Sequence, residues 1–425
     1  MLKYAFAAGL LWLGAAAAAA EVVVMSLVYR EGPYAGGGTD LADGYADYFT
    51  LLNERDGGIN GVPVKLLECE FGYNTDRGVA CYEEAKSAGS VVVQPWSTGV
   101  TIGVLPKSVV DNIPVHTMGY GVSGAADGSY FSHAFNFPAH YLHATYGQLA
   151  HIREVEGTLR GKRIGLVHHN SSYGKSPIPL LEEMQATEGF EVTLYPVDHP
   201  GEEQAETWDK IASDKPDYLL LWGWGIMNPT AIGEAARIDY PMDRIIGVWW
   251  SASSGDMPRR QKIAHGYKAV TFHAYGHSFE IFNDLNEYVY FGGKAAGDMN
   301  NIGTALYNRG VVAAIFASEA ARKAMEIHNT TAITPAMMRD GYEALDVSAE
   351  RLEELGMGGF VPPIRISCRD HVGPGQVAVV QWNKGLRKFK QISDFYRPNN
   401  PAIDAIIRRD AEAFAEKTGI QRRRC

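Results

Sequence analysis

The chain has 425 residues, of which 46 % are hydrophobic, and its 49 acidic and 39 basic side chains give a formal net charge of −10. This length exceeds what one compact core holds and fits two domains. The negative balance argues against nucleic acid as a partner, because phosphate binding requires clustered cations. The basic run from Arg422 to Arg424 stands at the C-terminal end, where we expect a solvated tail.

The first twenty residues carry the pattern of a cleavable secretory signal. Lys3 precedes an apolar run that continues to Leu13, and Ala18 and Ala20 supply the small residues that a signal peptidase requires. No later stretch is long and apolar enough to cross a bilayer, and no cysteine stands at the cleavage point for lipid attachment. We therefore expect residues 1–20 to be removed and the mature chain to be a free periplasmic protein.

Strands and helices alternate regularly through the first part of the mature chain. Such alternation predicts a parallel sheet covered on both faces, with ligands beyond the carboxyl ends of the strands. A glycine-rich turn at Gly36 to Gly38 precedes the first helix, which Gly57 and Gly58 end. The predicted strands are 22–28, 64–69, 91–93 and one around Val115, and the later helices run from 75 or 76 to 88 and from 99 to 110.

The same alternation restarts after Pro138, which indicates a second α/β unit of similar size. What remains is too short for a third domain, so we expect it to complete the first two. The predicted elements are helices 141–156, 176–188, 202–213, 230–238 and 307–327, strands 163–167, 191–197, 218–222 and 245–250, and a C-terminal strand pair, 363–368 with 376–382.

The four cysteines have no metal-binding spacing. In an oxidising compartment Cys69 and Cys81 could close a short loop as a disulfide or remain separate. Cys368 could equally be a buried thiol or pair with Cys425.

Enzyme motifs fail on inspection. Gly174-Lys175-Ser176 looks like the end of a phosphate-binding loop, but His169 stands where that loop requires a glycine. His273 and His277 lack the further ligand that a metal site needs. We predict no catalytic residues, no metal and no cofactor.

Aromatic side chains collect where the predicted strands end. Such positions line the cleft of an α/β fold, and small polar groups accompany them: Ser97 and Thr98 at a helix start, where free N–H groups favour a carboxylate, and the backbone from Gly119 to Gly121. Any one of these aromatic residues could instead be core packing. The aromatic residues are Trp96, Trp222, Trp224, Trp249, Trp250, Tyr120 and Tyr173.

Several segments in this order resemble one known family. They are NERDGGING at 53–61, QPWST at 94–98, residues 114–121, HHNSSYG at 168–174 and YLLLWGWG at 218–225. The chain resembles the periplasmic substrate-binding proteins of branched-chain amino acid ABC transporters, which have the type I periplasmic binding protein fold. The resemblance implies an α/β protein of two doubly wound parallel-sheet lobes, joined by a three-crossover hinge, that closes on a small molecule and docks onto an inner-membrane ABC permease.

The resemblance also divides the chain into lobes. Residues 21–137 with 273–360 would form the N-terminal lobe, and residues 138–272 with 361–400 the C-terminal lobe, with 401–425 as a C-terminal tail. The three crossovers would lie near 135–138, 271–276 and 360–363. We expect a monomer.

Residue by residue, Ser97 and the backbone of Gly119 match the family's carboxylate-binding positions, and Tyr173 and Trp224 match its aromatic contacts. The family's amino-acid binders have a threonine where this chain has Gly121, and an acidic residue near the position of Trp249 and Trp250. Here no acidic residue follows until Asp256, and an unpaired buried ammonium is costly. The predicted ligand-binding residues are Trp96, Ser97, Thr98, Gly119, Tyr120, Gly121, Tyr173, Trp224, Trp249 and Trp250.

We therefore predict a non-enzymatic solute-binding component of an ABC importer whose cargo is a small hydrophobic or aromatic carboxylate. One alternative is a branched-chain or aromatic amino acid, whose ammonium would need Asp256 or a backbone carbonyl as its acceptor. A second alternative is a periplasmic sensor that reports its ligand to another protein.

Overall fold

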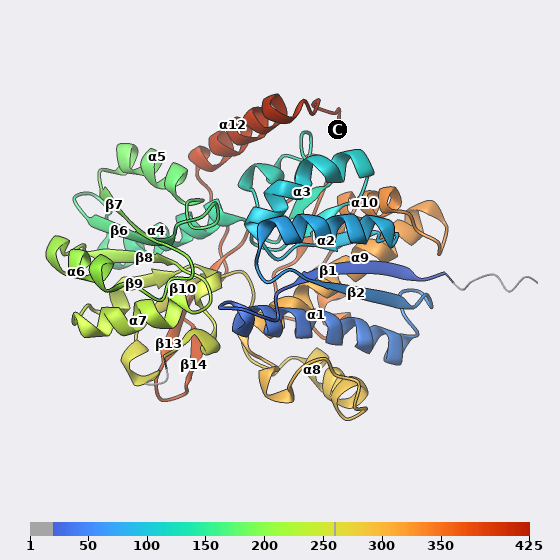
Figure 1. The fold of residues 1–425 in the computed structure, drawn as a ribbon, viewed down its shortest axis with the longest axis horizontal. Coiled ribbons are helices and arrows are strands. Elements are labelled where there is room, and N and C mark those ends of the chain that lie inside the picture. Colours follow the sequence, from blue (N-terminus) through green and yellow to red (C-terminus); the bar gives the residue numbers. More distant parts are fainter. Residues whose placement is uncertain (1–19, 259–260) are drawn as a thin grey trace, which may run out of the picture.

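The computed structural model describes residues 20–258 and 261–425. The predicted signal, residues 1–20, lies almost wholly outside the described residues. Two α/β lobes stand side by side, one around a five-stranded sheet and the other around a seven-stranded sheet (Figure 1). We call the first the N-terminal lobe and the second the C-terminal lobe.

The sheet of the N-terminal lobe has the strand order β2-β1-β3-β4-β5, and all of its pairs are parallel. The first strand is rich in valine and nearly all of its residues are buried, as a strand covered on both faces requires. The strands are β1 (Val22–Val28), β2 (Val64–Glu70), β3 (Val92–Gln94), β4 (Val115–Thr117) and β5 (Ala134–Asn136).

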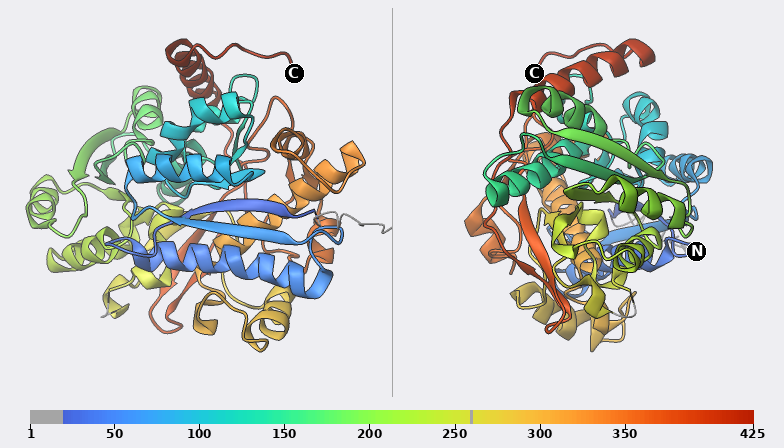
Figure 2. Two further views of the ribbon diagram at one scale, coloured as in Figure 1. Left: turned by 45° about the vertical axis from the view of Figure 1, so that its right-hand side comes forward. Right: turned by 90° about the vertical axis from the view of Figure 1, so that its left-hand side faces the viewer.

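Helices cover both faces of this sheet (Figure 2). The side chain of Asn74, rather than Thr75 or Asp76, caps the second helix by accepting the Arg77 N–H at 3.0 Å. Gly57 ends the first helix with a positive φ of 68°, as predicted. The helices are α1 (Ala35–Asp56), α2 (Thr75–Ser87), α3 (Thr98–Asp111), α9 (Ala305–His328) and α10 (Pro335–Glu343).

The sheet of the C-terminal lobe has the order β14-β13-β10-β9-β8-β6-β7. Its middle is parallel, and β13 and β14 add an antiparallel edge. The strands are β6 (Arg163–His169), β7 (Glu191–Val197), β8 (Tyr218–Trp222), β9 (Ile245–Gly247), β10 (Lys268–Thr271), β13 (Ala378–Asn383) and β14 (Lys388–Gln391). The helices are α4 (Tyr141–Glu156), α5 (Ile178–Glu188), α6 (Ala205–Asp214) and α7 (Met227–Arg237).

The chain passes between the lobes three times. It leaves the N-terminal sheet after β5 and enters the other lobe at α4, and it returns after β10. The third passage lies further along the chain than predicted. His371 still belongs beside the N-terminal lobe, because its ring bonds the Ala134 carbonyl at 2.7 Å and its carbonyl accepts the Asn136 N–H. Residues 361–371 therefore lie with the N-terminal lobe, and the passage falls between His371 and β13.

Three further local predictions differ from the structure. Residues 364–365 form β12 (Ile364–Arg365), which pairs with β11 (Asp346–Val347) instead of with the strand after it. Gly36 to Gly38 lie inside α1 rather than in a turn. Trp249 and Trp250 follow β9 in a short 3₁₀ turn instead of ending the strand.

The C-terminal segment is folded rather than a free tail. Its helix α12 (Pro401–Thr418) lies across both lobes, against α5 of one and the short turn η1 (Ser123–Ala126) of the other (Figure 1). Both possible disulfides are present, Cys69–Cys81 and Cys368–Cys425. Arg423, the middle residue of the basic run 422–424, pairs with Glu343 and donates to the Gly128 carbonyl, and these contacts fix the run to the N-terminal lobe.

Two short helices, α8 (Glu280–Asp284) and α11 (Ala349–Glu354), complete the N-terminal lobe. Within the described residues, every helix is too short or too polar to cross a membrane.

Candidate functional site

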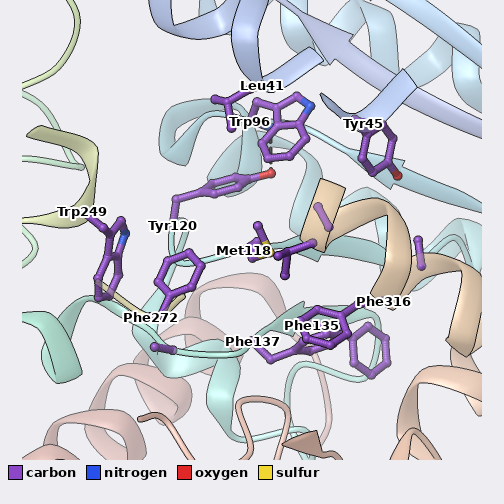
Figure 3. Close-up of a cluster of buried hydrophobic side chains, with 14 of the residues drawn as sticks. Leu41, Tyr45, Trp96, Met118, Tyr120, Phe135, Phe137, Trp249, Phe272 and Phe316 are labelled. Carbon is purple, nitrogen blue, oxygen red and sulfur yellow. Dashed lines mark hydrogen bonds between the residues drawn. The ribbon is translucent and has the colours of Figure 1, made fainter. Parts of the chain in front are cut away.

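An aromatic cavity lies between the two lobes. Its wall is continuous with the buried aromatic side chains of the N-terminal lobe, where Trp96 and Tyr120 lie one above the other (Figure 3). The space left inside has room for about one water molecule, so the lobes must part before a larger solute enters. The cavity is lined by Tyr29, Tyr73, Trp96, Thr98 and Tyr120 from the N-terminal lobe and by Tyr141, Tyr173, Trp224 and Trp250 from the C-terminal lobe.

Six of the ten predicted ligand-binding residues line this cavity, and four stand behind its wall. The lining residues are Trp96, Thr98, Tyr120, Tyr173, Trp224 and Trp250, and those behind are Ser97, Gly119, Gly121 and Trp249.

Trp96 and Tyr120 form a fixed wall on the side of the N-terminal lobe. The Trp96 indole N–H donates to the Ser26 hydroxyl at 2.9 Å, and the Trp96 backbone N–H donates to the Tyr120 hydroxyl at 2.7 Å. Trp96 has a positive φ of 48°, which turns the chain sharply between β3 and α3. Because these polar groups bond within the lobe, both rings present apolar surface to the cavity.

The N-terminus of α3 lies at the cavity wall, where its first residue, Thr98, lines the cavity. Ser97 caps the helix by accepting the Val100 N–H at 3.4 Å. The amides of Thr98 and Gly99 have no partner inside the helix, because the first N–H groups of any helix lack one. Thr98 lines the cavity and its hydroxyl lies 3.3 Å from the Tyr141 hydroxyl of the other lobe. This end of the helix favours an anion.

Part of the backbone from Gly119 to Gly121 is already engaged in hydrogen bonds within the protein. The Gly121 N–H already donates to the Thr98 hydroxyl at 3.2 Å. The Gly119 carbonyl accepts from the indole N–H groups of Trp249 at 2.7 Å and Trp250 at 3.1 Å. These two bonds join the lobes, so the segment holds the cavity closed in this structure.

Trp224 presents an unpaired donor. Its indole N–H is buried and has no hydrogen-bond partner among the described residues. Its ring packs edge-on against Trp250, with 5.3 Å between centroids, and against Tyr29 of the other lobe. A Cβ added at Gly37 would come within 2.8 Å of the Trp224 ring, so the glycine lets α1 approach that ring closely. Because buried donors are rarely left unpaired, this N–H is a candidate contact for a ligand acceptor.

Trp222, two residues earlier, shows the contrasting arrangement. Its indole N–H donates to the Gln148 side chain at 3.0 Å, and its side chain is fully buried in the C-terminal lobe. Trp222 is therefore part of the core and Trp224 part of the cavity.

Arg309, which we did not predict from the sequence, places a positive charge behind the cavity wall. It is fully buried on α9, with its guanidinium 4.6 Å from the centre of the Trp250 ring. One of its nitrogens donates to the Trp249 carbonyl at 3.0 Å, and another has no hydrogen-bond partner within residues 20–258 and 261–425. Burial lowers the pKa of Arg309 to about 10, so it stays charged at neutral pH.

A second, acidic pocket adjoins the cavity on the side of α1. It is lined by Gly37 and Asp40 of α1 and by Ser253 and Asp256 of the C-terminal lobe. Burial raises the pKa of both carboxyls to about 7, helped at Asp40 by Asp43 and at Asp256 by Asp40. Asp40 lies far from Asp256 in the sequence, so only the fold brings these carboxyls together.

A third polar contact joins the lobes outside the cavity. The Tyr34 hydroxyl, just before α1, lies 2.8 Å from His169 Nε2 and 2.6 Å from His199 Nδ1. His169, at the end of β6, thereby joins the C-terminal lobe to the segment that precedes α1. His273 near the second passage is fully buried, and burial lowers its pKa to about 3.

The structure gives no reason to place a metal here. Among residues 20–258 and 261–425, the one group with metal-ligand spacing is Cys69, Cys81 and Glu84, and both of its sulfurs belong to a disulfide.

The structure has the arrangement expected from the sequence: two lobes with three passages between them and a cleft lined from both sides. The sequence profile of the periplasmic binding protein family matches residues 21–387. The chain belongs to this family. Its members are substrate-binding components that work with ABC transporters. The family also explains the architecture, which is the type I fold of parallel-sheet lobes.

Solved structures agree with this assignment. A protein described as an ABC transporter permease from the Pseudomonas fluorescens group is 33% identical, with a TM-score of 0.87 over 96% of this chain and 100% of that one. A branched-chain amino acid ABC transporter protein from Thermus thermophilus with bound valine is 18% identical (TM-score 0.77; 91% of this chain and 98% of that one).

A solute-binding protein from R. palustris in complex with benzoate is 13% identical (TM-score 0.67; 90% of this chain and 98% of that one). The sequence identity to these two ligand-bound structures is low, so the similarity establishes a shared fold and does not identify the ligand of this chain. No curated protein sequence matches the chain.

Sequence reasoning missed five residues at this site, and the reason differs among them. Tyr29 and Tyr73 stand just after β1 and β2, so the strand-end rule that found Trp96 also applies to them. Tyr141 begins a helix, Asp40 lies within one and Arg309 lies in the middle of a long one. No local pattern marks those three positions.

Proposed function

We propose that this protein is the periplasmic solute-binding component of an ABC importer and that its cargo is a small carboxylate with an apolar or aromatic body. The aromatic cavity between the lobes is the observation that carries the proposal. Its cargo would stack on Trp224, Trp250 and Tyr173, and its carboxylate would face the α3 N-terminus. The unpaired Trp224 N–H and the charge of Arg309 favour an acceptor with negative charge in that space.

Binding requires the lobes to part and close again. Hydrogen bonds between the lobes surround the cavity. They join Thr98 to Tyr141, Gly119 to Trp249 and Trp250, and Tyr34 to His169. We propose that the three passages act as the hinge. Small-angle scattering should then give a smaller radius of gyration with saturating cargo than without it, and an unchanged radius would contradict the hinge.

Isothermal titration calorimetry tests the cargo class. Benzoate and phenylacetate represent the proposed carboxylates, and L-leucine, L-valine and L-phenylalanine represent amino acids. We expect the carboxylates to bind and the amino acids to bind more weakly. Tight binding of the amino acids with no affinity for the simple carboxylates would overturn the proposed cargo.

One observation favours the amino-acid alternative. Asp40 and Asp256 line a pocket next to Trp224, and their raised pKa values mark two carboxyls that an ammonium would stabilise in the ionised form. An amino acid could place its carboxylate at α3 and its ammonium in this pocket. The valine complex of the Thermus thermophilus protein shows that the fold accepts such a cargo.

Proton release separates the two cargo classes. At pH 7 an ammonium entering the acidic pocket should displace protons from Asp40 and Asp256, so the measured heat should vary with the ionisation enthalpy of the buffer. An uncharged or purely anionic group there should displace none. Asp256→Asn should weaken amino-acid binding at least tenfold and leave a simple carboxylate within about twofold.

A further inference from the structure

A groove lined by arginines lies on the face of the molecule where the chain passes between the lobes. Its walls come from residues 126–143, from residues 369–373 at the start of the third passage, and from Arg397, α12 and the chain after it. In a protein with a net charge of −10, this concentration of cations is unusual. The groove holds Arg369, Arg397, Arg408, Arg422, Arg423 and Arg424.

Two of these arginines are already engaged by the protein. Arg423 pairs with Glu343 and donates to the Gly128 carbonyl at 2.9 Å. Arg422 donates to the Ser129 hydroxyl at 3.3 Å and lies over the Tyr130 ring.

The other four guanidinium groups have no carboxylate partner among the residues that the structure describes. Within the described part of the chain, no acidic oxygen lies within 4.0 Å of the side chains of Arg369, Arg397, Arg408 or Arg424, and all four residues are exposed. Four unpaired cations around one groove repel one another, and an anion bound among them removes that repulsion.

The acidic residues of the groove do not balance this charge. Asp127 accepts from the N–H and hydroxyl of Ser129. Asp370 accepts from the N–H groups of Val372 and Gly373 at 3.0 and 2.9 Å. Asp404 is exposed in the first turn of α12, where it complements the helix dipole. Among the side chains that line the groove, three carboxylates face six guanidinium groups.

A buried histidine at the base of the groove is a second, independent sign of a missing partner. His140 is fully buried, and neither of its ring nitrogens has a hydrogen-bond partner among the described residues. Its ring stacks on His143, which also lines the groove, with 3.8 Å between centroids. A polar ring this deeply buried is rarely left without a partner.

We propose that this groove is an anion-binding site for a compound that carries two or more phosphate groups. The planar forks of arginine match phosphate oxygens in pairs, and the spread of unpaired guanidinium groups along the groove suits a multivalent anion better than a single small one. The site is separate from the aromatic cavity. Because α12 contacts both α5 and η1, an occupant of the groove touches a helix that contacts both lobes.

Calorimetry with sodium tripolyphosphate at low ionic strength tests the site. We expect the double variant Arg369→Ser with Arg408→Ser to bind tripolyphosphate at least tenfold more weakly than the wild type does. The double variant Arg369→Lys with Arg408→Lys keeps the charge but not the planar fork, so its affinity should lie between those two. The matched control is Arg77→Ser with Arg160→Ser, two exposed arginines outside the groove, which should stay within about twofold. Raising the salt concentration should weaken wild-type binding, because exposed charges are screened.

A second arm identifies the source of the phosphate. Co-sedimentation with vesicles of phosphatidylglycerol and phosphatidylcholine, compared with phosphatidylcholine alone, reports a lipid headgroup. The wild type could bind the anionic vesicles but not tripolyphosphate, while the groove variants bind neither. That result supports the site and identifies a lipid headgroup as its ligand. The proposal is overturned if the wild type binds neither probe, or if the control variant loses as much affinity as the groove variant. Melting temperatures of all variants show that each one is folded.

Discussion

The aromatic cavity and the arginine groove are both built where the two lobes meet, but by opposite physical means. The cavity is buried and uncharged at its wall, and its polar signals are the unpaired indole N–H of Trp224 and the N-terminus of α3 at Thr98. The groove is exposed, and its signal is an excess of cations. A ligand of the cavity gains by desolvation and shape, whereas a ligand of the groove gains by charge that salt can screen. The two sites should therefore respond to different changes.

Removing a disulfide should give the largest effect on stability. Replacing Cys368 and Cys425 by serine opens a cross-link with a sequence separation of 57 and should lower the free energy of unfolding by about 4 kcal/mol. The same change at Cys69 and Cys81, with a separation of 12, should lower it by about 3 kcal/mol. Urea unfolding measures both.

The same two variants also test whether the sites are independent. The bond at Cys425 anchors the chain that carries Arg422 to Arg424, so its loss should weaken tripolyphosphate binding and leave cargo affinity unchanged. A parallel loss of cargo affinity would show that the groove and the cavity act as one unit.

Trp224→Ala should give the largest effect on cargo. Loss of its buried contact should weaken cargo binding by about 1 to 3 kcal/mol, or roughly 5- to 150-fold, in calorimetry. Trp222→Phe is the control at the end of the same strand, and it should lower the melting temperature while the folded protein keeps its affinity. If Trp224→Ala instead lowers only stability, Trp224 belongs to the core.

His140→Phe should change how stability depends on pH. Burial lowers the pKa of His140 to about 3, below its ordinary value of 6.5, so the folded protein keeps the ring neutral while the unfolded chain binds a proton. This contribution is fully present above pH 6.5 and is lost as the pH falls toward 3. The free energy of unfolding should therefore drop on acidification by about 1.4 kcal/mol per pH unit for this group.

Phenylalanine removes that proton and keeps a ring to stack on His143. Urea unfolding at pH 7, 6 and 5 should show a shallower decline for the variant than for the wild type. Equal slopes would contradict the neutral, unpartnered state of His140. The buried His116, whose pKa burial also lowers to about 3, offers an independent repeat.

Ser97→Ala should give the smallest effect. Ser97 caps α3 and stands behind the cavity wall, so its loss should reduce stability by about 1 kcal/mol and cargo affinity by less than Trp224→Ala does. Thermal melting and calorimetry on the one variant give both values. A larger loss of affinity than in Trp224→Ala would mean that Ser97 touches the cargo directly.

The sequence alone determined the regular elements that carry strong patterns. The strands Val22–Val28, Glu191–Val197 and Tyr218–Trp222 and the helix Tyr141–Glu156 have the predicted bounds, because long apolar runs or a clear helical period mark them. The order of segments along the chain was also enough to predict the family, the two-lobe architecture and the position of most aromatic residues just after the strands.

Tertiary structure decided what local pattern cannot encode. The two-residue strand β12 has too few residues to show a period, so its pairing with β11 and the late third passage were not visible. The meeting of Asp40 with Asp256, the charge of Arg309 behind Trp250 and the arginine groove all join residues far apart in the chain. Whether Trp222 or Trp224 keeps its N–H unpaired depends on which neighbour the fold brings within hydrogen-bond distance, and that is a property of packing alone.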